Sequence, residues 1–523
     1  MTIDADADSG RRALMLAFGG LLVAMFIAAL DQTIMATALP TIAGQLGGLG
    51  ELPWVVTVYV LGAAASTPVW GKASDLHGRR DLIRAAILVF ICFSALSGVA
   101  QSIGWLIAFR AAQGIGAGGV MTLATASVGD LVPPRERGRY QGYIQLTFLL
   151  ASLAGPLLGG LFVDHLSWRW AFYVNVPIGV IALGLLTAYL HVPVQRRPVR
   201  IDYAGGALLA ITVVAVLLIA TWGGNEYTWG SPQIVGLIAG ALILLATFVW
   251  RERRAAEPVL PLRLFGDPVF VVVSAALFIA TISLFAAIVF LPLFLQLVTG
   301  ASATGSGLLM LPLLAASAIS TIASGQIMAK TGRYKVFPIL GLAAMSVGLL
   351  LFATLGATGS RMAAALFMVV FGIGFGMVTQ ILMVAIQNAV EPREIGTATA
   401  AANLFRALGG SVGVAIYGAI FTSSLRHWLP LELGGHAARG ITAAGIQTTP
   451  SRIHALPPAL QHGIANAVGN SLHSVFLVAA PIALAGFVIA ALLREQPLRG
   501  HGPADAQAAQ PPGPSPKHER IAA

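Results

Sequence analysis

Fourteen stretches of about 20 or more largely apolar residues run through the chain. A helix needs about 20 such residues to cross the hydrocarbon layer of a membrane. Inside lipid every backbone N–H and C=O must be paired within its own segment, and runs this long exceed the length of barrel strands. The sequence therefore predicts an all-α polytopic membrane protein. Its expected spans are 13–36, 53–73, 82–101, 104–128, 141–163, 170–190, 203–222, 232–250, 269–298, 304–329, 336–356, 361–388, 396–424 and 473–494.

The placement of basic residues orients these spans. Of 31 lysines and arginines, 24 fall in the set of loops that shares a side with the N-terminus, and five fall in the other set. Loops rich in Lys and Arg stay in the cytoplasm, so both termini are expected there. The net charge of +10 thus follows topology and does not indicate nucleic-acid binding. Arginine far outnumbers lysine, which favours a high-GC bacterial source and hence the bacterial cytoplasmic (inner) membrane.

A short motif occurs twice at a constant offset. GKASDLHGRR at 71–80 aligns with GQIMAKTGRY at 325–334, and PPRERG at 133–138 aligns with EPREIG at 391–396 at nearly the same offset. Two repeated six-helix halves with a substrate site between them are typical of secondary transporters. The sequence thus predicts two bundles of one design.

This repeat divides the chain into segments. We expect a cytoplasmic N-terminus over 1–12, a first six-helix bundle over 13–190, and a linker with two extra spans over 191–268. A second bundle over 269–494 is expected to carry an extracellular loop at 425–472, and 495–523 is Pro- and Ala-rich and predicts a disordered cytoplasmic tail. The histidines of the loop fit no metal template, so no metal site is expected.

Asp31 is the one carboxylate placed deep within a predicted span. An ionised group there costs roughly 2.5 to 3.5 kcal/mol on insertion scales, so something must offset that cost. Burial favours the neutral acid and nearby cations the ionised form, so an interior aspartate can take up and release a proton as its surroundings change. The alternative is an aspartate near a helix end that reaches water or caps a neighbouring helix.

Arg110 adds a second buried charge, and Gln113 and Gly114 follow one turn later on the same helix face. Arginine stays protonated in proteins and cannot itself carry the proton. It can stabilise a nearby carboxylate or hold water in a proton path. The alternative is a snorkelling or structural arginine that is satisfied by carbonyls.

The stretch AGPLLGG at 154–160 combines glycines with a proline. Gly155 and Gly159 lie four residues apart on one helix face, and Pro156 removes a backbone donor. Close approach of a neighbouring helix and a local bend are expected here.

Several motifs, together with the inserted helix pair, carry a family resemblance. They are LDQTIMATALP at 30–40, GKASDLHGRR at 71–80, RAAQGIGAGG at 110–119 and AGPLLGG at 154–160. The chain resembles the major facilitator superfamily, in its fourteen-helix branch of drug:proton antiporters. The resemblance implies a major facilitator fold and proton coupling through Asp31 and Arg110. It also implies an exporter, through the antiporter motif Gly155, Pro156, Gly159 and Gly160.

The charges of GKASDLHGRR are expected where the two halves meet on the cytoplasmic side. Asp75 is placed to face the N-terminus of a helix in the other half, whose dipole would stabilise the carboxylate by about 0.3 to 1 kcal/mol. By resemblance, that helix begins near Gly396, and Asp75 with Arg79 latches one conformation. The second copy has Ala329 in place of Asp75. The alternative is a solvated positive-inside loop. The expected latch residues are Gly71, Asp75, Gly78, Arg79 and Arg80.

Polar, small and aromatic residues form stripes at helical spacing, which should line a central cavity. Packing between helices is the alternative for each residue. Such a lining suits bulky amphipathic molecules. No acid occurs from Gly305 to Lys330, which disfavours divalent cations and favours monovalent, neutral or zwitterionic compounds. Arg406 adds positive potential that would also suit an anionic or carboxylated metabolite. The expected lining is Gln32, Tyr59, Gln113, Gln145, Phe148, Phe285, Gln296, Gln380, Asn403, Arg406 and Tyr417.

The sequence therefore predicts a proton-coupled antiporter that exports amphipathic drugs or secondary metabolites by alternating access. It is expected to act as a monomer in the lipid bilayer, driven by the proton motive force without a cofactor. An exporter of lipid, lipopeptide or one dedicated metabolite is the main alternative, and an uptake porter of the same fold is another. No HExxH, GxSxG or paired Asp and His motif points to an enzyme, and a nontransporting sensor would not need Asp31.

Overall fold

The computed structural model describes the chain in seven segments, with gaps that include parts of two loops and the C-terminal tail. Within these segments all long elements are helices, and fourteen of them are long and apolar enough to cross a membrane. The predicted all-α fold with fourteen spans is confirmed. The tail expected at 495–523 lies outside the described residues from 499 onward. The described segments are 3–46, 51–190, 202–224, 226–301, 303–356, 359–433 and 457–498.

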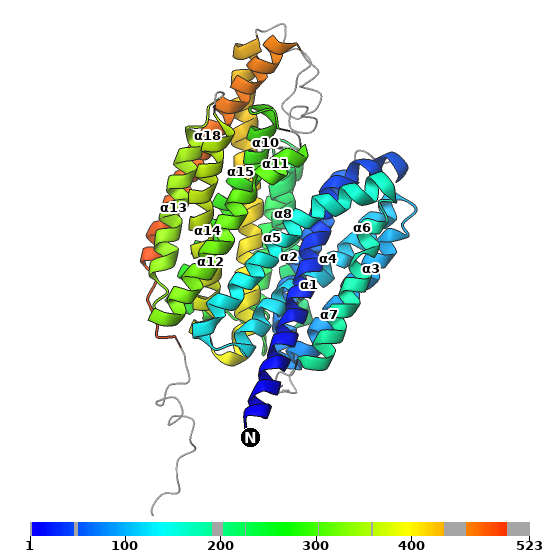
Figure 1. Cartoon of the computed structure of the whole chain (residues 1–523), viewed down its shortest axis with the longest axis vertical. Helices are drawn as coiled ribbons and strands as arrows, with labels where there is room; N and C mark the ends of the chain where they lie inside the picture. Colours follow the sequence, from blue (N-terminus) through cyan, green and yellow to red (C-terminus); the bar gives the residue numbers. More distant parts are fainter. Residues whose placement is uncertain are drawn as a thin grey trace, which may run out of the picture.

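The helices of the N-terminal part form one bundle, and its apolar side chains pack into two adjoining cores. In Figure 1 these helices run from blue to cyan and stand beside the green-to-orange helices of the C-terminal part. The elements are α1 (Ile3–Leu46), α2 (Leu52–His77), α3 (Arg79–Gly98), α4 (Ile103–Leu131), α5 (Pro134–His165), α6 (Trp170–Tyr173) and α7 (Asn175–Tyr189).

The C-terminal part has a core of its own, which the inserted helices join from one side. The inserted pair is α8 (Tyr203–Trp222) and α9 (Pro232–Glu252). The other elements are η2 (Leu262–Gly266), α10 (Pro268–Leu297), α11 (Ala303–Leu309), α12 (Leu311–Thr331), α13 (Val336–Ala353), α14 (Arg361–Ala389), η3 (Pro392–Glu394), α15 (Ile395–Leu433) and α18 (Pro458–Ala491).

Two predicted spans are broken into two helices each. The span expected at 170–190 is α6 followed by α7, and the span expected at 304–329 is α11 followed by α12. Pro177 and Pro312 lie in the first turns of α7 and α12. A proline lacks an N–H and fits best in the first turn of a helix, where that N–H would have no partner, so a new helix begins just ahead of each.

The loop expected at 425–472 is shorter than the hydropathy suggests. Helix α15 continues to Leu433 and α18 already begins at Pro458, and residues 434–456 lie outside the described part. The Asn466 amide donates to the Glu432 carboxylate at 3.1 Å, which joins the two extensions. Hydropathy marks only the part of a helix that lies in lipid, whereas backbone hydrogen bonds carry it on through polar residues. For the same reason α5 begins at Pro134 instead of 141.

We call the end of the bundle that carries His77, Arg79, Arg137 and Lys330 the basic end. The two halves meet at this end, where α2 packs on α15 and α5 packs on α12. A Cβ added to Gly71 would lie 2.7 Å from the Gly396 carbonyl oxygen, and one added to Gly138 would lie 2.5 Å from the Cα of Gly325. Backbone therefore meets backbone in both seams.

The inserted helix α8 packs against α2 and α15, and α9 packs on α8 with most of its surface exposed. Asp202 caps α8 by accepting from the Gly205 N–H at 3.0 Å, and it pairs with Arg251 of α9 at 2.9 Å. Lys72 of α2 pairs with Glu257, just after α9, at 2.7 Å. These contacts fasten the inserted pair beside the α2–α15 seam.

Candidate functional site

Asp31 is the centre of a buried polar network in the N-terminal bundle. Helix α1 places its carboxylate with no exposed surface. Oδ1 accepts from the Gln113 and Asn175 amides, each at 2.9 Å, and Oδ2 accepts from the Arg110 guanidinium. Three donors from two other helices therefore satisfy the carboxylate in its ionised form. In this structure Asp31 neither reaches water nor caps a helix, so the alternative interpretation does not hold.

Arg110 is 1% exposed and does not snorkel. Its guanidinium lies over the Tyr59 ring at 4.2 Å from the ring centre. It also donates to the Gln113 side-chain oxygen at 3.0 Å and to the Val55 carbonyl at 3.3 Å. Tyr59 of α2 in turn donates to the carbonyl of Ala28 on α1 at 3.2 Å, and this bond holds its ring in place against Arg110. Aromatic, amide and carbonyl contacts thus fix the arginine against Asp31.

Asn175 and Ser94 belong to this network and are absent from the sequence prediction. Asn175 stands at the start of α7 and donates to both Asp31 and the Ser94 hydroxyl, the latter at 3.0 Å. Ser94 of α3 donates to the Phe172 carbonyl at 2.9 Å. The available signal was a lone asparagine inside an apolar span, directly before a proline-containing turn. Through these two residues the Asp31 carboxylate is connected to α3 and α7.

A second charged cluster closes the basic end. Asp75 accepts from the backbone N–H of Gly396 at 3.0 Å and from both the N–H and the hydroxyl of Thr397 at 2.7 Å. Arg79 pairs with Asp75 at 2.7 Å and with Asp130 at 2.6 Å. The predicted contact of Asp75 with the helix that begins near Gly396 is therefore present, whereas its action as a latch stays a prediction. Asp130 is a member that the sequence did not indicate.

Gly78 and Arg80, two further residues of the predicted latch, do not share the contacts of Asp75 and Arg79. Gly78 has a φ of +99° and ends α2 directly before α3 begins, a conformation that favours glycine. Arg80 does not reach the other half, because it donates to the Thr187 carbonyl of α7 at 2.5 Å. Consecutive residues of a helix point about 100° apart, so Arg79 and Arg80 cannot face the same partner. Arg80 is therefore not part of the latch contact.

The antiporter motif lies against α1 close to Asp31. A Cβ added to Gly155 would lie 2.5 Å from the Thr33 Cβ, and the Thr33 hydroxyl donates to the Ala151 carbonyl at 3.0 Å. Gly159 is buried, whereas a Cβ on Gly160 would meet nothing within 4 Å. Pro156 lies inside α5, which continues through it. The close approach predicted for this motif is carried by Gly155 of α5, which lies against Thr33, two residues along α1 from Asp31.

The predicted cavity residues lie in different surroundings. Tyr59 and Gln113 belong to the Asp31 network, whereas the side chain of Gln32 is exposed. Gln145 donates to Ser317 across the halves at 3.4 Å, Gln296 donates to Ser306 at 3.0 Å, and Arg406 donates to Asn403 at 3.4 Å. Phe148 and Phe285 are partly exposed, Gln380 is buried, and Tyr417 is fully buried with no partner for its hydroxyl among the described residues.

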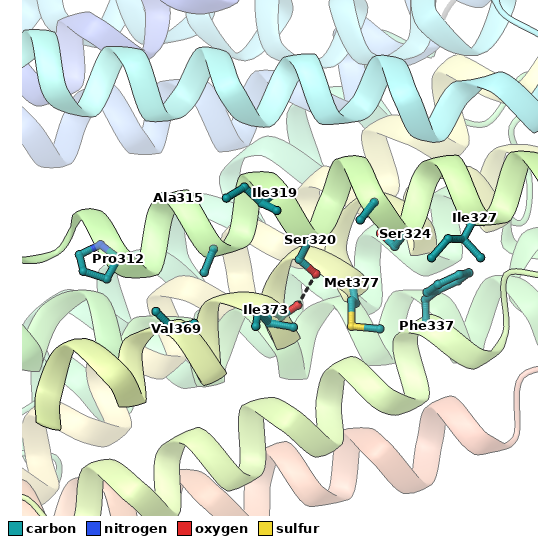
Figure 2. A pocket seen from close by; sticks show the side chains of 12 residues that line it. Pro312, Ala315, Ile319, Ser320, Ser324, Ile327, Phe337, Val369, Ile373 and Met377 are labelled. Atoms are coloured by element: carbon teal, nitrogen blue, oxygen red, sulfur yellow. Dashed lines mark hydrogen bonds between the residues drawn. The ribbon is translucent and has the colours of Figure 1, made fainter.

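Two cavities lie elsewhere in the bundle. One of about 510 Å³ is formed by α12, α13 and α14, and Figure 2 shows its apolar lining with the Ser320 hydroxyl bonded to the Ile373 carbonyl. The other, of about 640 Å³, lies between α2, α4 and α8. None of the predicted cavity residues lines either one.

Two helical bundles that meet at one end, the first of which holds a buried carboxylate–arginine pair, have the architecture of a polytopic membrane transporter. A model of the Major Facilitator Superfamily matches residues 21–205 and 199–414. The chain therefore belongs to the Major Facilitator Superfamily, and its fourteen spans fit the fourteen-helix drug:proton antiporter branch.

Its relatives include named transporters. The chain is 40% identical over 483 residues to an uncharacterized MFS-type transporter of Mycobacterium tuberculosis, covering 92% of this chain and 69% of that one. It is 38% identical over 423 residues to the multidrug transporter protein MdtP of Bacillus subtilis, covering 81% and 78%. The crystal structure of the human organic anion transporter MFSD10 superposes with a TM-score of 0.59 at 16% identity, covering 92% and 99%. That last likeness concerns the fold alone.

Proposed function

We propose that this protein is a proton-coupled antiporter that exports amphipathic drugs or secondary metabolites across a bacterial cytoplasmic membrane. The observation that carries the proposal is the network of Asp31, Arg110, Gln113 and Asn175. The similarity to a protein named as a multidrug transporter supports the substrate class. The protein would work as a monomer in the bilayer, with the proton motive force in place of a cofactor.

The network offers a physical route from protonation to movement. An ionised carboxylate only accepts hydrogen bonds, whereas a neutral carboxyl carries a hydrogen that must be donated. Asp31 accepts from three donors, and a proton on the carboxyl would weaken all three hydrogen bonds, because a bond to a charged acceptor is stronger than one to a neutral acceptor. The donors belong to α4 and α7, and the carboxylate belongs to α1. Protonation would therefore loosen these three helices from one another.

The basic end would face the cytoplasm, since loops rich in Lys and Arg are retained there. The halves meet at that end, so the described conformation would be closed toward the cytoplasm and ready to take a proton from outside. At an inside-negative potential each inward charge supplies about 2.3 kcal/mol per 100 mV, which can drive export of the substrate.

Inverted membrane vesicles test the proposal directly. Vesicles with an acidic lumen are loaded with a pH-sensitive dye, and a monovalent fluorescent drug is added on the side of the basic end. Wild type should accumulate the drug and release lumenal protons, and a protonophore should abolish both. Asp31→Asn should insert normally yet do neither, and Asp81→Asn, whose carboxylate is 56% exposed, serves as the matched control. Equal proton release by wild type and Asp31→Asn would exclude Asp31 as the coupling site.

One observation favours a second candidate function, the export of lipid. The cavity between α2, α4 and α8 is bounded almost entirely by apolar atoms, and its two charged lining residues are Lys72 and Asp202. An acyl chain fits that apolar lining, and the charges of Lys72 and Asp202 are already paired with Glu257 and Arg251. Movement of a fluorescent phospholipid between leaflets, with no transport of the drug in the same vesicles, would decide for lipid.

A further inference from the structure

Arg406 is a guanidinium deep in the second bundle. It lies twelve residues after Glu394, about 18 Å along the axis of α15 at 1.5 Å per residue. The one hydrogen bond described for it is to the side-chain oxygen of Asn403, at 3.4 Å. No carboxylate of the described residues forms an ion pair with it, whereas Arg110, the deep arginine of the first bundle, has Asp31.

The sequence explains why no internal counter-ion is available. From Pro268 to Leu431 the only acidic residues are Glu391 and Glu394, and both lie at the basic end. Glu394 already pairs with Arg263, and Glu391 pairs with Arg393. The membrane-spanning interior of the second bundle therefore carries a positive charge and no negative one. A charge in such a position is costly unless a partner is present at least part of the time.

The contacts of α15 show which way Arg406 faces. Thr399, about two turns earlier on the same side of the helix, accepts from the Gln387 amide of α14 at 3.1 Å. Gly410, one turn later, lies against the Phe285 ring of α10, where an added Cβ would be 2.7 Å from Cε2. This side of α15 thus faces α10 and α14 and not the lipid. Arg406 remains partly exposed, so its accessible surface is directed into the bundle.

We propose that Arg406 binds the negatively charged group of the exported molecule, and that Phe285 contacts its aromatic or apolar body. The substrate would then be an amphipathic organic anion with a carboxylate or sulfonate. A guanidinium presents a planar array of donors that matches such a group, and a desolvated ion pair is stronger than one in water. This inference rests on the proposed export function and specifies its substrate class.

A matched pair of probes isolates the charge. Pyrenebutyric acid and its methyl ester share one aromatic body and differ in the carboxylate. Binding to protein in nanodiscs is followed by energy transfer from tryptophan to pyrene, with empty nanodiscs subtracted. Wild type should bind the acid more tightly than the ester. Arg406→Gln should weaken binding of the acid about tenfold, the size expected for loss of one charged hydrogen bond. It should leave the ester unchanged, and Arg406→Lys should restore part of the difference.

The control is Arg426→Gln, which removes an exposed arginine from the same helix. The proposal is overturned if the acid binds no more tightly than the ester, if Arg406→Gln leaves the acid unaffected, or if both probes weaken together. Failure of proton coupling is a separate result, because Asp31→Asn should bind the acid like wild type while losing proton-linked transport in vesicles. Binding without coupling would refute only the antiport mechanism.

Discussion

The Asp75 carboxylate accepts both the N–H and the hydroxyl of Thr397, 322 residues further along the chain, at 2.7 Å each. An acid on α2 thereby caps α15 of the other half. Arg79 and Asp130 surround it, so the seam combines an ion pair with a helix N-terminus.

Asp75→Asn should weaken this seam and leave the fold intact. The amide keeps the shape but loses the charge that the helix dipole stabilises by about 0.3 to 1 kcal/mol, a factor of roughly two to five in population. Spin labels at the exposed positions 139 and 333 report the distance between α5 and the segment after α12 at the basic end. We expect a second, longer distance in the variant and slower drug transport. An unchanged distance distribution together with wild-type transport would rule out a latch.

Gly155→Ala should destabilise the protein, while Gly160→Ala should not. The new methyl group at Gly155 would collide with Thr33, and overpacking of this kind costs about 1 to 3 kcal/mol. Nothing lies within 4 Å of a Cβ at Gly160. Thermal unfolding of the purified variants should give a Tm lowered by several degrees for the first and an unchanged Tm for the second. Equal melting would mean that α1 and α5 can separate freely at this point.

Asn175→Leu should reduce drug transport at least about tenfold with normal insertion, because it removes one of the charged hydrogen bonds to Asp31. Ser94→Ala should have a smaller effect, since Ser94 touches Asp31 only through Asn175. Initial rates in inverted vesicles, normalised to the amount of inserted protein, compare the two. If Ser94→Ala reduces transport more than Asn175→Leu, the main role of the Asn175 amide is its bond to Ser94 of α3 and not its bond to the Asp31 carboxylate.

The cap of α8 should respond to acid. Hydrogen bonds from Arg251 lower the pKa of Asp202 below its ordinary value of 3.8, so the ionised form is the stabilising one. Its contribution is complete at pH values above 3.8 and is lost as the pH falls through the lowered pKa. Asp202→Asn should therefore melt below wild type at pH 7 and equal it in strong acid. The gap should narrow in high salt, since Arg251 is 45% exposed. A difference in Tm between wild type and Asp202→Asn that persists in strong acid would show that the variant changes packing and not the ion pair.

Hydropathy, charge placement and the internal repeat were enough to predict the spans and the all-α fold, whereas the meeting of Asp75 with the helix that begins near Gly396 was predicted from the family resemblance. They could not supply Asn175, because its contact with Asp31 joins positions 144 residues apart and depends on how α1 and α7 pack. Asp130 was missed for the same reason, as Arg79 reaches it only once α3 lies beside α4. Arg80 was grouped with its neighbour by sequence adjacency, although helix geometry turns it toward α7. The sequence gives the positions of the charged residues, whereas their partners depend on how the helices pack in three dimensions.

The contact of Gly138 with Gly325 limits how the basic end can open. Both residues lie in the repeated motifs, and the matching pair in the other seam is Gly396 with Gly71. Where two backbones touch without side chains, a slide along the axis would drive a neighbouring side chain into the gap, since Met328 already lies against Gly138 and Ile322 lies against Gly142, one turn further along α5. Lateral parting and rotation about the contact require no such collision. The two halves are therefore expected to rock about these glycines as rigid bodies, with α5 and α12 keeping their axial register throughout the cycle.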